Sequence, residues 1–194
     1  MGEPRIKGYE YGHVPISPVN LKELKELEAT VRFTDQDRAC LKQAGTFLDD
    51  DAEALVDGWR KTIGSQPHLA QWFFGPDHRP DEGYKAAVKP RFVRWVIDVF
   101  GRPFDQAWLD YQQEIGLRHT PAKKNKTDRA AAPEVVPLRY LIAFTAPVLE
   151  SVRQHLQAKG LPAAEVDRIH AAWTKAVMLS IALWSNPYTK EGLW

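Results

Sequence analysis

Apolar side chains recur every three or four residues along most of this 194-residue chain, in stretches separated by proline and glycine. That spacing places them on one face of an α-helix. No stretch shows the sustained alternation of apolar and polar residues that a half-buried β-strand requires. The sequence therefore predicts an all-α fold with about eight helices.

Residues that start or stop helices mark several boundaries in this pattern. Thr34 precedes an acidic turn and is a suitable N-cap, and Pro137 opens a long helical stretch. Residues 160–162, Gly-Leu-Pro, separate that stretch from the last one. Pro90 lies inside the helical pattern of residues 81–99, where it predicts a kink or a broken turn because it lacks a backbone N–H.

The length of the chain fits one domain, which we expect to span residues 1–194. Residues 1–20 contain three prolines and three glycines and predict an irregular N-terminal extension. Tyr9 and Tyr11 lie in that extension and are able to pin it to the body of the protein. A short amphipathic helix is expected directly after it.

The composition argues against several classes of function. A net charge of +1 lacks the basic excess typical of nucleic-acid binding. No apolar run is long enough for a membrane span, and the N-terminus has no signal-peptide core, so we expect a cytoplasmic protein. The single cysteine, Cys40, has no partner for an internal disulfide, and no Cys/His cluster has the spacing of a structural zinc site.

One histidine stands out because it ends an apolar helical face. Trp108, Tyr111, Ile115 and His119 recur at helical spacing, and Pro121 makes a continued helix unfavourable. A neutral imidazole beside an apolar pocket suits the axial position of a haem iron. A hydrogen-bonded histidine in an ordinary core would give the same pattern, so this motif alone leaves both interpretations open.

Further motifs follow one another in a fixed order along the chain. They are Gly8-Tyr9-Glu10-Tyr11-Gly12, Trp108-Leu109-Asp110-Tyr111-Gln112, Glu114-Ile115-Gly116-Leu117-Arg118-His119, Lys123-Lys124-Asn125, Arg139-Tyr140-Leu141-Ile142-Ala143-Phe144 and Ala182-Leu183-Trp184-Ser185-Asn186-Pro187-Tyr188. In these motifs and their order the chain resembles the protoglobins, the single-domain relatives of globin-coupled sensors. The resemblance covers nearly the whole chain.

The resemblance implies a globin fold with an additional N-terminal helix and an N-terminal extension. It implies haem b in a buried pocket reached by apolar tunnels, with His119 as the proximal ligand of the iron. It also implies reversible binding of dioxygen, carbon monoxide and nitric oxide, and a homodimer formed through the last two helices.

The resemblance also assigns residues to the pocket. Trp59, Phe73 and Phe92 match distal and ring-packing aromatic residues of the family, and Phe144 and Val148 match pocket-lining positions. Each of these has plain core packing as its alternative.

Two further expectations concern the helix that ends at the histidine. We expect the Ile115 carbonyl, four residues before His119, to accept a hydrogen bond from the imidazole and fix its orientation. Gly116 either lets the porphyrin approach the helix or is simply a tolerated helix glycine, which costs about 1 kcal/mol relative to alanine.

Arg60 departs from the family, in which a distal tyrosine usually follows the residue matched by Trp59. Pointing inward, the Arg60 guanidinium would favour anionic ligands and assist peroxide cleavage as a catalytic group. Pointing outward, it would pair with a haem propionate or lie in solvent, and the cost of burying an unpaired charge favours this orientation.

Three functions remain open at this level. The first is a haem protein that reversibly binds gases. The second is a haem enzyme with peroxidase-like, nitrite or nitric oxide, or carbene-transfer activity aided by Arg60. The third is a helical interaction protein without a cofactor, which a haem absorption spectrum would exclude.

Overall fold

The computed structural model describes residues 6–190 and residue 194, and all regular secondary structure in them is helical. The helices are α1 (Leu21–Thr30), α2 (Asp35–Leu48), α3 (Ala52–Gly64), α4 (Pro67–Ala70), α5 (Glu82–Gly101), α6 (Gln106–Leu117), α7 (Leu138–Ala158) and α8 (Ala163–Ser185), with short 3-10 turns at η1 (Asp49–Asp51), η2 (Gln71–Phe73) and η3 (Asn186–Tyr188). Within these residues the only β-type pairing is an isolated bridge between Phe74 and Pro80. The all-α prediction is confirmed.

The helix boundaries follow the local signals of the sequence. The Thr34 side chain caps α2 by accepting from the Asp37 amide, and α7 starts directly after Pro137. Residues 160–162 separate α7 from α8 as predicted. Helix α5 continues through Pro90, so the chain is not broken there, and α7 likewise contains Pro147.

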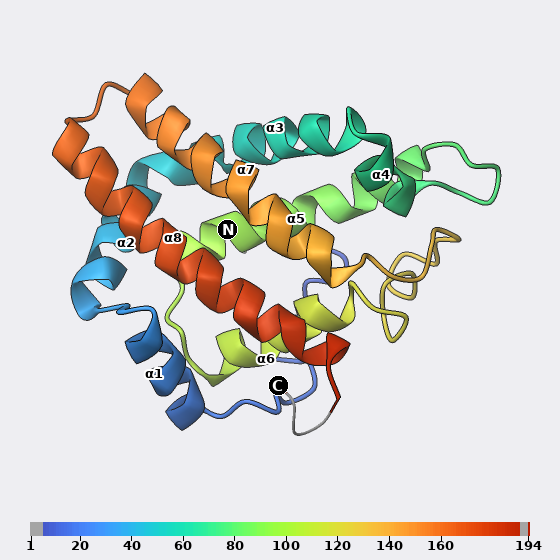
Figure 1. Ribbon diagram of the computed structural model, residues 1–194, viewed down its shortest axis with the longest axis horizontal. Helices are drawn as coiled ribbons and strands as arrows, with labels where there is room; N and C mark the ends of the chain where they lie inside the picture. The colour runs from blue at the N-terminus through green and yellow to red at the C-terminus, as the bar shows by residue number, and fades with distance from the viewer. Residues whose placement is uncertain (1–5, 191–193) are drawn as a thin grey trace.

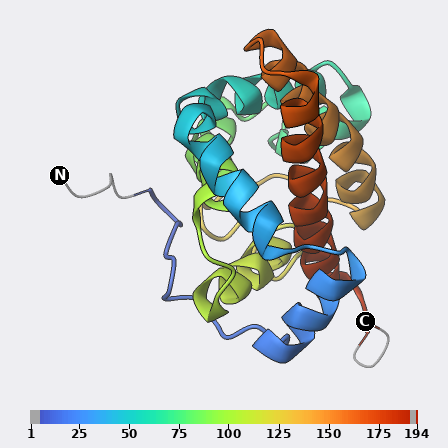
Figure 2. The same ribbon diagram turned by 90° about the vertical axis from the view of Figure 1, so that its left-hand side faces the viewer.

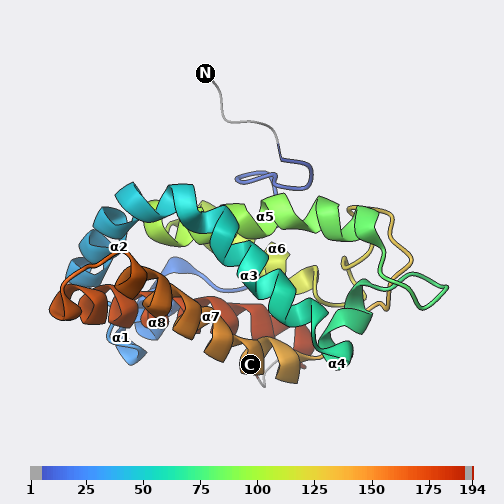
Figure 3. The same cartoon turned by 90° about the horizontal axis from the view of Figure 1, so that it is seen from above.

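The long helices enclose the core in crossed layers. Helices α7 and α8 run antiparallel beside each other, with α6 against the C-terminal part of α8 (Figure 1). Helix α2 packs on both α5 and α8 (Figure 2). Helix α3 crosses between α5 on one side and α7 on the other (Figure 3). Buried aromatic side chains fill the centre, among them Trp59, Trp95 and Trp173.

The additional N-terminal helix has its own small core. Leu24 of α1 is fully buried and belongs to one cluster with Trp108 and Leu109 of α6 and Leu183 of α8. An asparagine cap, Asn20, starts α1 through hydrogen bonds to the first turn of the helix. Helix α1 therefore closes the side of the molecule where α6 meets α8.

Residues 6–20 form an irregular segment that is held against the helices, as the tyrosines suggested. The rings of Tyr9 and Tyr11 lie 4.7 and 5.5 Å from the ring of Tyr111 on α6. The Ser17 amide donates to the Asp110 carboxylate at 2.7 Å. The extension thus packs on the helix that leads to His119.

No helix in the described part of the chain is both long and apolar enough to cross a membrane.

Candidate functional site

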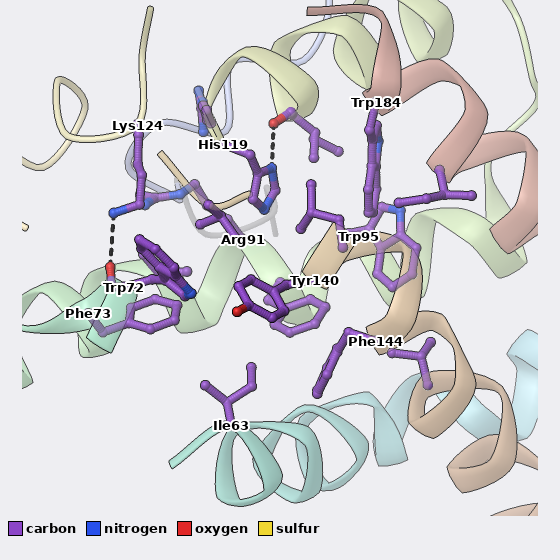
Figure 4. A pocket seen from close by; sticks show the side chains of 18 of the residues that line it. Ile63, Trp72, Phe73, Arg91, Trp95, His119, Lys124, Tyr140, Phe144 and Trp184 are labelled. Atoms are coloured by element: carbon purple, nitrogen blue, oxygen red, sulfur yellow. Dashed lines mark hydrogen bonds between the residues drawn. The ribbon is translucent and has the colours of Figure 1, made fainter. Parts of the chain in front are cut away.

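A cavity of about 230 Å³ lies between α3, α5, α7, α8 and the end of α6. Its wall is mostly apolar, with aromatic side chains from several helices turned toward the same space (Figure 4). The few polar groups on the wall include His119, Lys124, Arg91 and Arg118. An interior of this kind accommodates a flat, largely apolar ligand that also carries charged groups.

His119 lies just beyond the last turn of α6, where the chain leaves the helix. The helix ends at Leu117, and the His119 amide still donates to the Gly116 carbonyl at 3.0 Å. The Nδ1 atom of the ring lies 2.8 Å from the Ile115 carbonyl oxygen, which confirms the expected partner. The second ring nitrogen points away from α6 toward the cavity (Figure 4).

The surroundings of the imidazole keep it neutral. Burial lowers the pKa of His119 to about 4, against a weaker opposite effect of the Ile115 hydrogen bond. Because a carbonyl only accepts, the Nδ1–H tautomer fits this contact and leaves the Nε2 lone pair toward the cavity. The indole of Trp184 lies nearly parallel to the ring, with centroids 6.0 Å apart and an angle of 23°. The ring is thus fixed by one hydrogen bond and one stacking contact.

The backbone of His119 is tied to two segments that are distant in sequence. The Val136 amide donates to the His119 carbonyl at 2.9 Å. The Tyr188 hydroxyl lies 3.1 Å from the same oxygen and 2.6 Å from the Val136 carbonyl oxygen. Tyr188 thus joins the segment after α8 to the backbone of His119 and to Val136, just before α7.

Four of the six residues expected at a cofactor lie on the cavity wall. Phe73, Phe92, Phe144 and Val148 all line it, and they come from η2, α5 and α7. Phe73 and Phe144 are seen facing the cavity in Figure 4. The wall thus combines apolar side chains from both halves of the sequence.

Trp59 and Gly116 lie elsewhere. The Trp59 indole is 1% exposed, donates to Ser151 Oγ, and lies 5.2 Å from the Phe92 ring, centroid to centroid. A Cβ atom at Gly116 would lie 3.0 Å from the Trp184 carbonyl oxygen. Trp59 therefore supports a cavity residue from behind, and the missing side chain of Gly116 lets α6 approach α8.

Arg60 does not line this cavity. Its guanidinium lies 3.5 Å from the Asp57 carboxylate and donates to the Lys85 carbonyl at 3.3 Å. It borders a second, smaller cavity between α3 and α5. Of the two orientations that the sequence left open, this is the outward one, and the partners are protein groups.

Lys124, from the Lys123-Lys124-Asn125 motif, is a cavity residue that the sequence does not set apart from Lys123 and Lys126. Lys124 is only 5% exposed and lines the cavity, whereas Lys126 is exposed. Its amine donates to the Trp72 carbonyl at 2.9 Å and lies 5.2 Å above the Tyr84 ring. Burial lowers the pKa of Lys124 to about 8. Nothing local distinguishes Lys124 from its neighbours, so only the fold identifies it.

Two arginines and the N-terminal extension form a charged edge of the cavity. The Arg91 guanidinium pairs with the Asp128 carboxylate, with one N–O distance of 3.2 Å. Arg118 pairs with the Glu114 carboxylate at 3.0 Å. A Cβ atom at Gly8 would lie 3.3 and 3.4 Å from the guanidinium nitrogens of Arg91 and Arg118. Gly8 has a φ of +75°, which favours glycine, so the residue type permits both the turn and the close approach.

No three His, Cys, Asp or Glu side chains gather into a metal-binding group in the portion of the chain that the structure covers. His119 stands on the wall as a single nitrogen donor. A single imidazole suits a metal whose remaining ligands belong to a macrocycle. The apolar wall, the oriented neutral imidazole and the adjacent cations together fit a haem.

Comparison with known proteins agrees with this geometry. Residues 20–194 match the family model for Protoglobin. A search of curated proteins found no match. Among solved structures, the globin domain of a Geobacter sulfurreducens globin-coupled sensor is similar with a TM-score of 0.67 and 17% identity, over 86% of this chain and 97% of that chain. The structural likeness confirms the globin fold, and the family match shows that the chain belongs to the protoglobin family.

Proposed function

We propose that the chain is a haem protein that reversibly binds small gaseous ligands, with haem b as cofactor and His119 as the proximal ligand of the iron. The observation that carries this proposal is the neutral imidazole of His119, held by the Ile115 carbonyl with its second nitrogen toward an apolar cavity. Membership of the protoglobin family supports it independently.

His119 would bind through Nε2, whose lone pair is available because the proton resides on Nδ1. The Ile115 hydrogen bond fixes the plane of the ring and makes the other nitrogen a better donor. The Trp184 indole stacked on the ring limits its rotation. When bound, haem supplies an iron with an open coordination position for dioxygen, carbon monoxide or nitric oxide.

The apolar wall would hold the porphyrin and exclude water. Phe73, Phe92, Phe144 and Val148 offer the apolar surface, and burial against it stabilises each contact by roughly 1 kcal/mol or more. Trp59 would act indirectly by supporting Phe92. We place Gly116 in the site only as the residue that brings α6 close to α8.

Lys124 is the residue best suited to a carboxylate of the porphyrin. Arg91 and Arg118 already have the carboxylates of Asp128 and Glu114, whereas the hydrogen bonds of the Lys124 amine go to carbonyl and amide oxygens. A buried amine without a counter-ion is unfavourable, so an added carboxylate offsets the cost of its burial. The negative charge of a porphyrin carboxylate would thus complement the positive charge of the Lys124 amine.

The enzymatic alternative depends on Arg60 as a catalytic group, and Arg60 lies off the cavity that contains His119. We therefore propose gas binding in preference to peroxidase-like, nitrite or carbene-transfer activity through Arg60. Turnover with peroxide or nitrite that is no faster than with free haem would agree with this choice.

Absorption spectra of the ferric, ferrous and carbon monoxide forms test the proposal. We expect a Soret band in the purified protein, and its weakening or loss in His119→Ala. His170→Ala is the matched control, because His170 lies on α8 beside Arg153 and off the cavity wall. Protein that stays colourless when supplied with hemin would refute the function, and an unchanged His119→Ala spectrum would refute the ligand.

We also propose that the chain works in the cytoplasm as a homodimer formed through α7 and α8. Ile142 on α7 is 53% exposed and lies on a helix that packs on α8, so it offers apolar surface to a second copy of the chain. Light scattering should show a dimer that Ile142→Asp weakens. Leu21→Asp, at a position 43% exposed on α1, is the control, and a monomeric wild-type protein would refute this proposal.

A further inference from the structure

A second cavity, of about 140 Å³, lies between the C-terminal half of α3, the segment around α4 and the first half of α5. These elements meet at the α4 end of the molecule (Figure 3). Much of its wall is apolar, including Phe73, Phe74, Val88 and Phe92. Arg60, Gly64 and Lys85 line this cavity and do not line the cavity of His119.

Among the residues that the structure describes, three cations border the second cavity and no carboxylate does. Arg60, Lys85 and Lys89 are on its wall. Their acidic partners are Asp57, Glu82 and Glu53, none of which lines the cavity. The charged groups that the wall presents to the cavity are therefore cations, and the carboxylates paired with them lie outside it.

Arg60 is the cation with the most unused capacity for hydrogen bonding. Its guanidinium has five N–H groups, and the two contacts it makes, to Asp57 and to the Lys85 carbonyl, are long at 3.5 and 3.3 Å. Lys89, in contrast, has close contacts of 2.6 and 2.9 Å with Glu53 and Asp57. A planar guanidinium with free donors matches a carboxylate in a two-point contact.

We propose that the second cavity binds a small carboxylate with an apolar tail, such as a short fatty acid or a single-ring aromatic acid. The carboxylate contacts Arg60, with Lys85 and Lys89 adding positive charge, and the tail lies against the apolar side chains. Neither the apolar side chains alone nor the cations alone would select a carboxylate with an apolar tail. A simple inorganic anion leaves the apolar surface unused, and a neutral apolar compound leaves the cations unused.

An occupant of the second cavity would touch the wall of the first. Ile63, Phe73, Val88 and Phe92 line both cavities. A tail that holds Phe73 and Phe92 in place restricts the space available in the cavity of His119. Binding at Arg60 is therefore expected to alter ligand rebinding at the larger cavity as a secondary effect.

Calorimetric titration of the purified full-length protein with hexanoate, and with hexanamide as its neutral analogue, tests the proposal. We expect hexanoate to bind at least about tenfold more tightly than hexanamide, since the amide lacks the charge-assisted contact. Affinity should also rise by about fourfold for each added methylene until the cavity is full. The titration does not depend on haem, so its failure is distinct from failure of the proposed gas binding.

Two variants locate the site. Arg60→Met should remove the preference for hexanoate, whereas Arg153→Met, which alters an arginine on α7 outside both cavities, should retain it. Gly64→Leu should block both compounds, because Gly64 lines only the second cavity and a Cβ atom there meets nothing within 4 Å. Equal binding of the acid and the amide, absence of binding, or full hexanoate affinity in Arg60→Met or in folded Gly64→Leu would overturn the proposal.

Discussion

Replacing Gly116 by alanine should destabilise the protein, although alanine is normally the better helix former. A Cβ atom at this position would lie 3.0 Å from the Trp184 carbonyl oxygen, 3.1 Å from the Trp184 Cα and 3.2 Å from Cδ of Pro187. All three distances are shorter than ordinary van der Waals contacts of a methyl carbon. Two of the atoms belong to the main chain and the third to a proline ring, so none can turn aside as a flexible side chain would.

The expected size of the effect follows from two opposing contributions. Alanine in place of a helix glycine gains about 1 kcal/mol. Forcing a methyl group into a closely packed contact costs about 1–3 kcal/mol, because α6 has to move away from α8. We therefore expect the free energy of unfolding to fall by about 1 kcal/mol in Gly116→Ala.

Gly58→Ala is the matched control. Gly58 also lies inside a helix, α3, but it is exposed and a Cβ atom there would meet nothing within 4 Å. With no clash to oppose the helix propensity, this variant should gain roughly 0.5–1 kcal/mol. The two glycine-to-alanine changes should thus have opposite signs.

Urea unfolding followed by circular dichroism, on cofactor-free protein, measures both variants. Cofactor-free protein is needed because any ligand bound only to the folded state adds to the apparent stability. If Gly116→Ala were stabilised to the same extent as Gly58→Ala, the close packing of α6 on α8 would not constrain this position.

Three further perturbations test other parts of the structure. The pKa of Lys124 is about 8 in the folded protein, against an ordinary value of 10.5, so the unfolded chain binds more protons between these two values. The free energy of unfolding of the apoprotein should therefore rise with pH in that window, and Lys124→Met should lose this slope in urea titrations. Gly8 has a φ of +75°, and a Cβ there would clash with the Thr127 methyl, so Gly8→Val should release the N-terminal extension and speed its cleavage in limited proteolysis. An unchanged cleavage rate would contradict the close contact. Pro90→Ala should raise the free energy of unfolding by about 1–3 kcal/mol by restoring a helix hydrogen bond, and no gain in thermal unfolding would mean that α5 already compensates for the missing donor.

Features governed by neighbouring residues could be predicted from the sequence. The cap at Thr34, the start of α7 after Pro137 and the end of α6 before His119 all depend on groups within a few residues. The same holds for the Ile115 carbonyl, which one helical turn brings to the imidazole. Helical periodicity and capping chemistry are sufficient to place such contacts.

Features governed by contacts between distant segments could not be predicted. Trp59 turns toward Ser151, a partner on α7, and Lys124 reaches the Trp72 carbonyl. The orientation of Arg60 depends on the Lys85 carbonyl, which α5 presents to α3. In each case the deciding partner comes from another element of the fold, and no local pattern reveals it.

The Tyr188 hydroxyl links the backbone of His119 to α7 and α8, the two longest helices in the described part of the chain. It bridges the carbonyls of His119 and Val136, just before α7 begins, and it sits in η3, directly after α8 ends. A displacement of His119 along the direction of its free nitrogen therefore pulls on the start of one of these helices and on the end of the other. The position of His119 is thus coupled through Tyr188 to the positions of two helix ends.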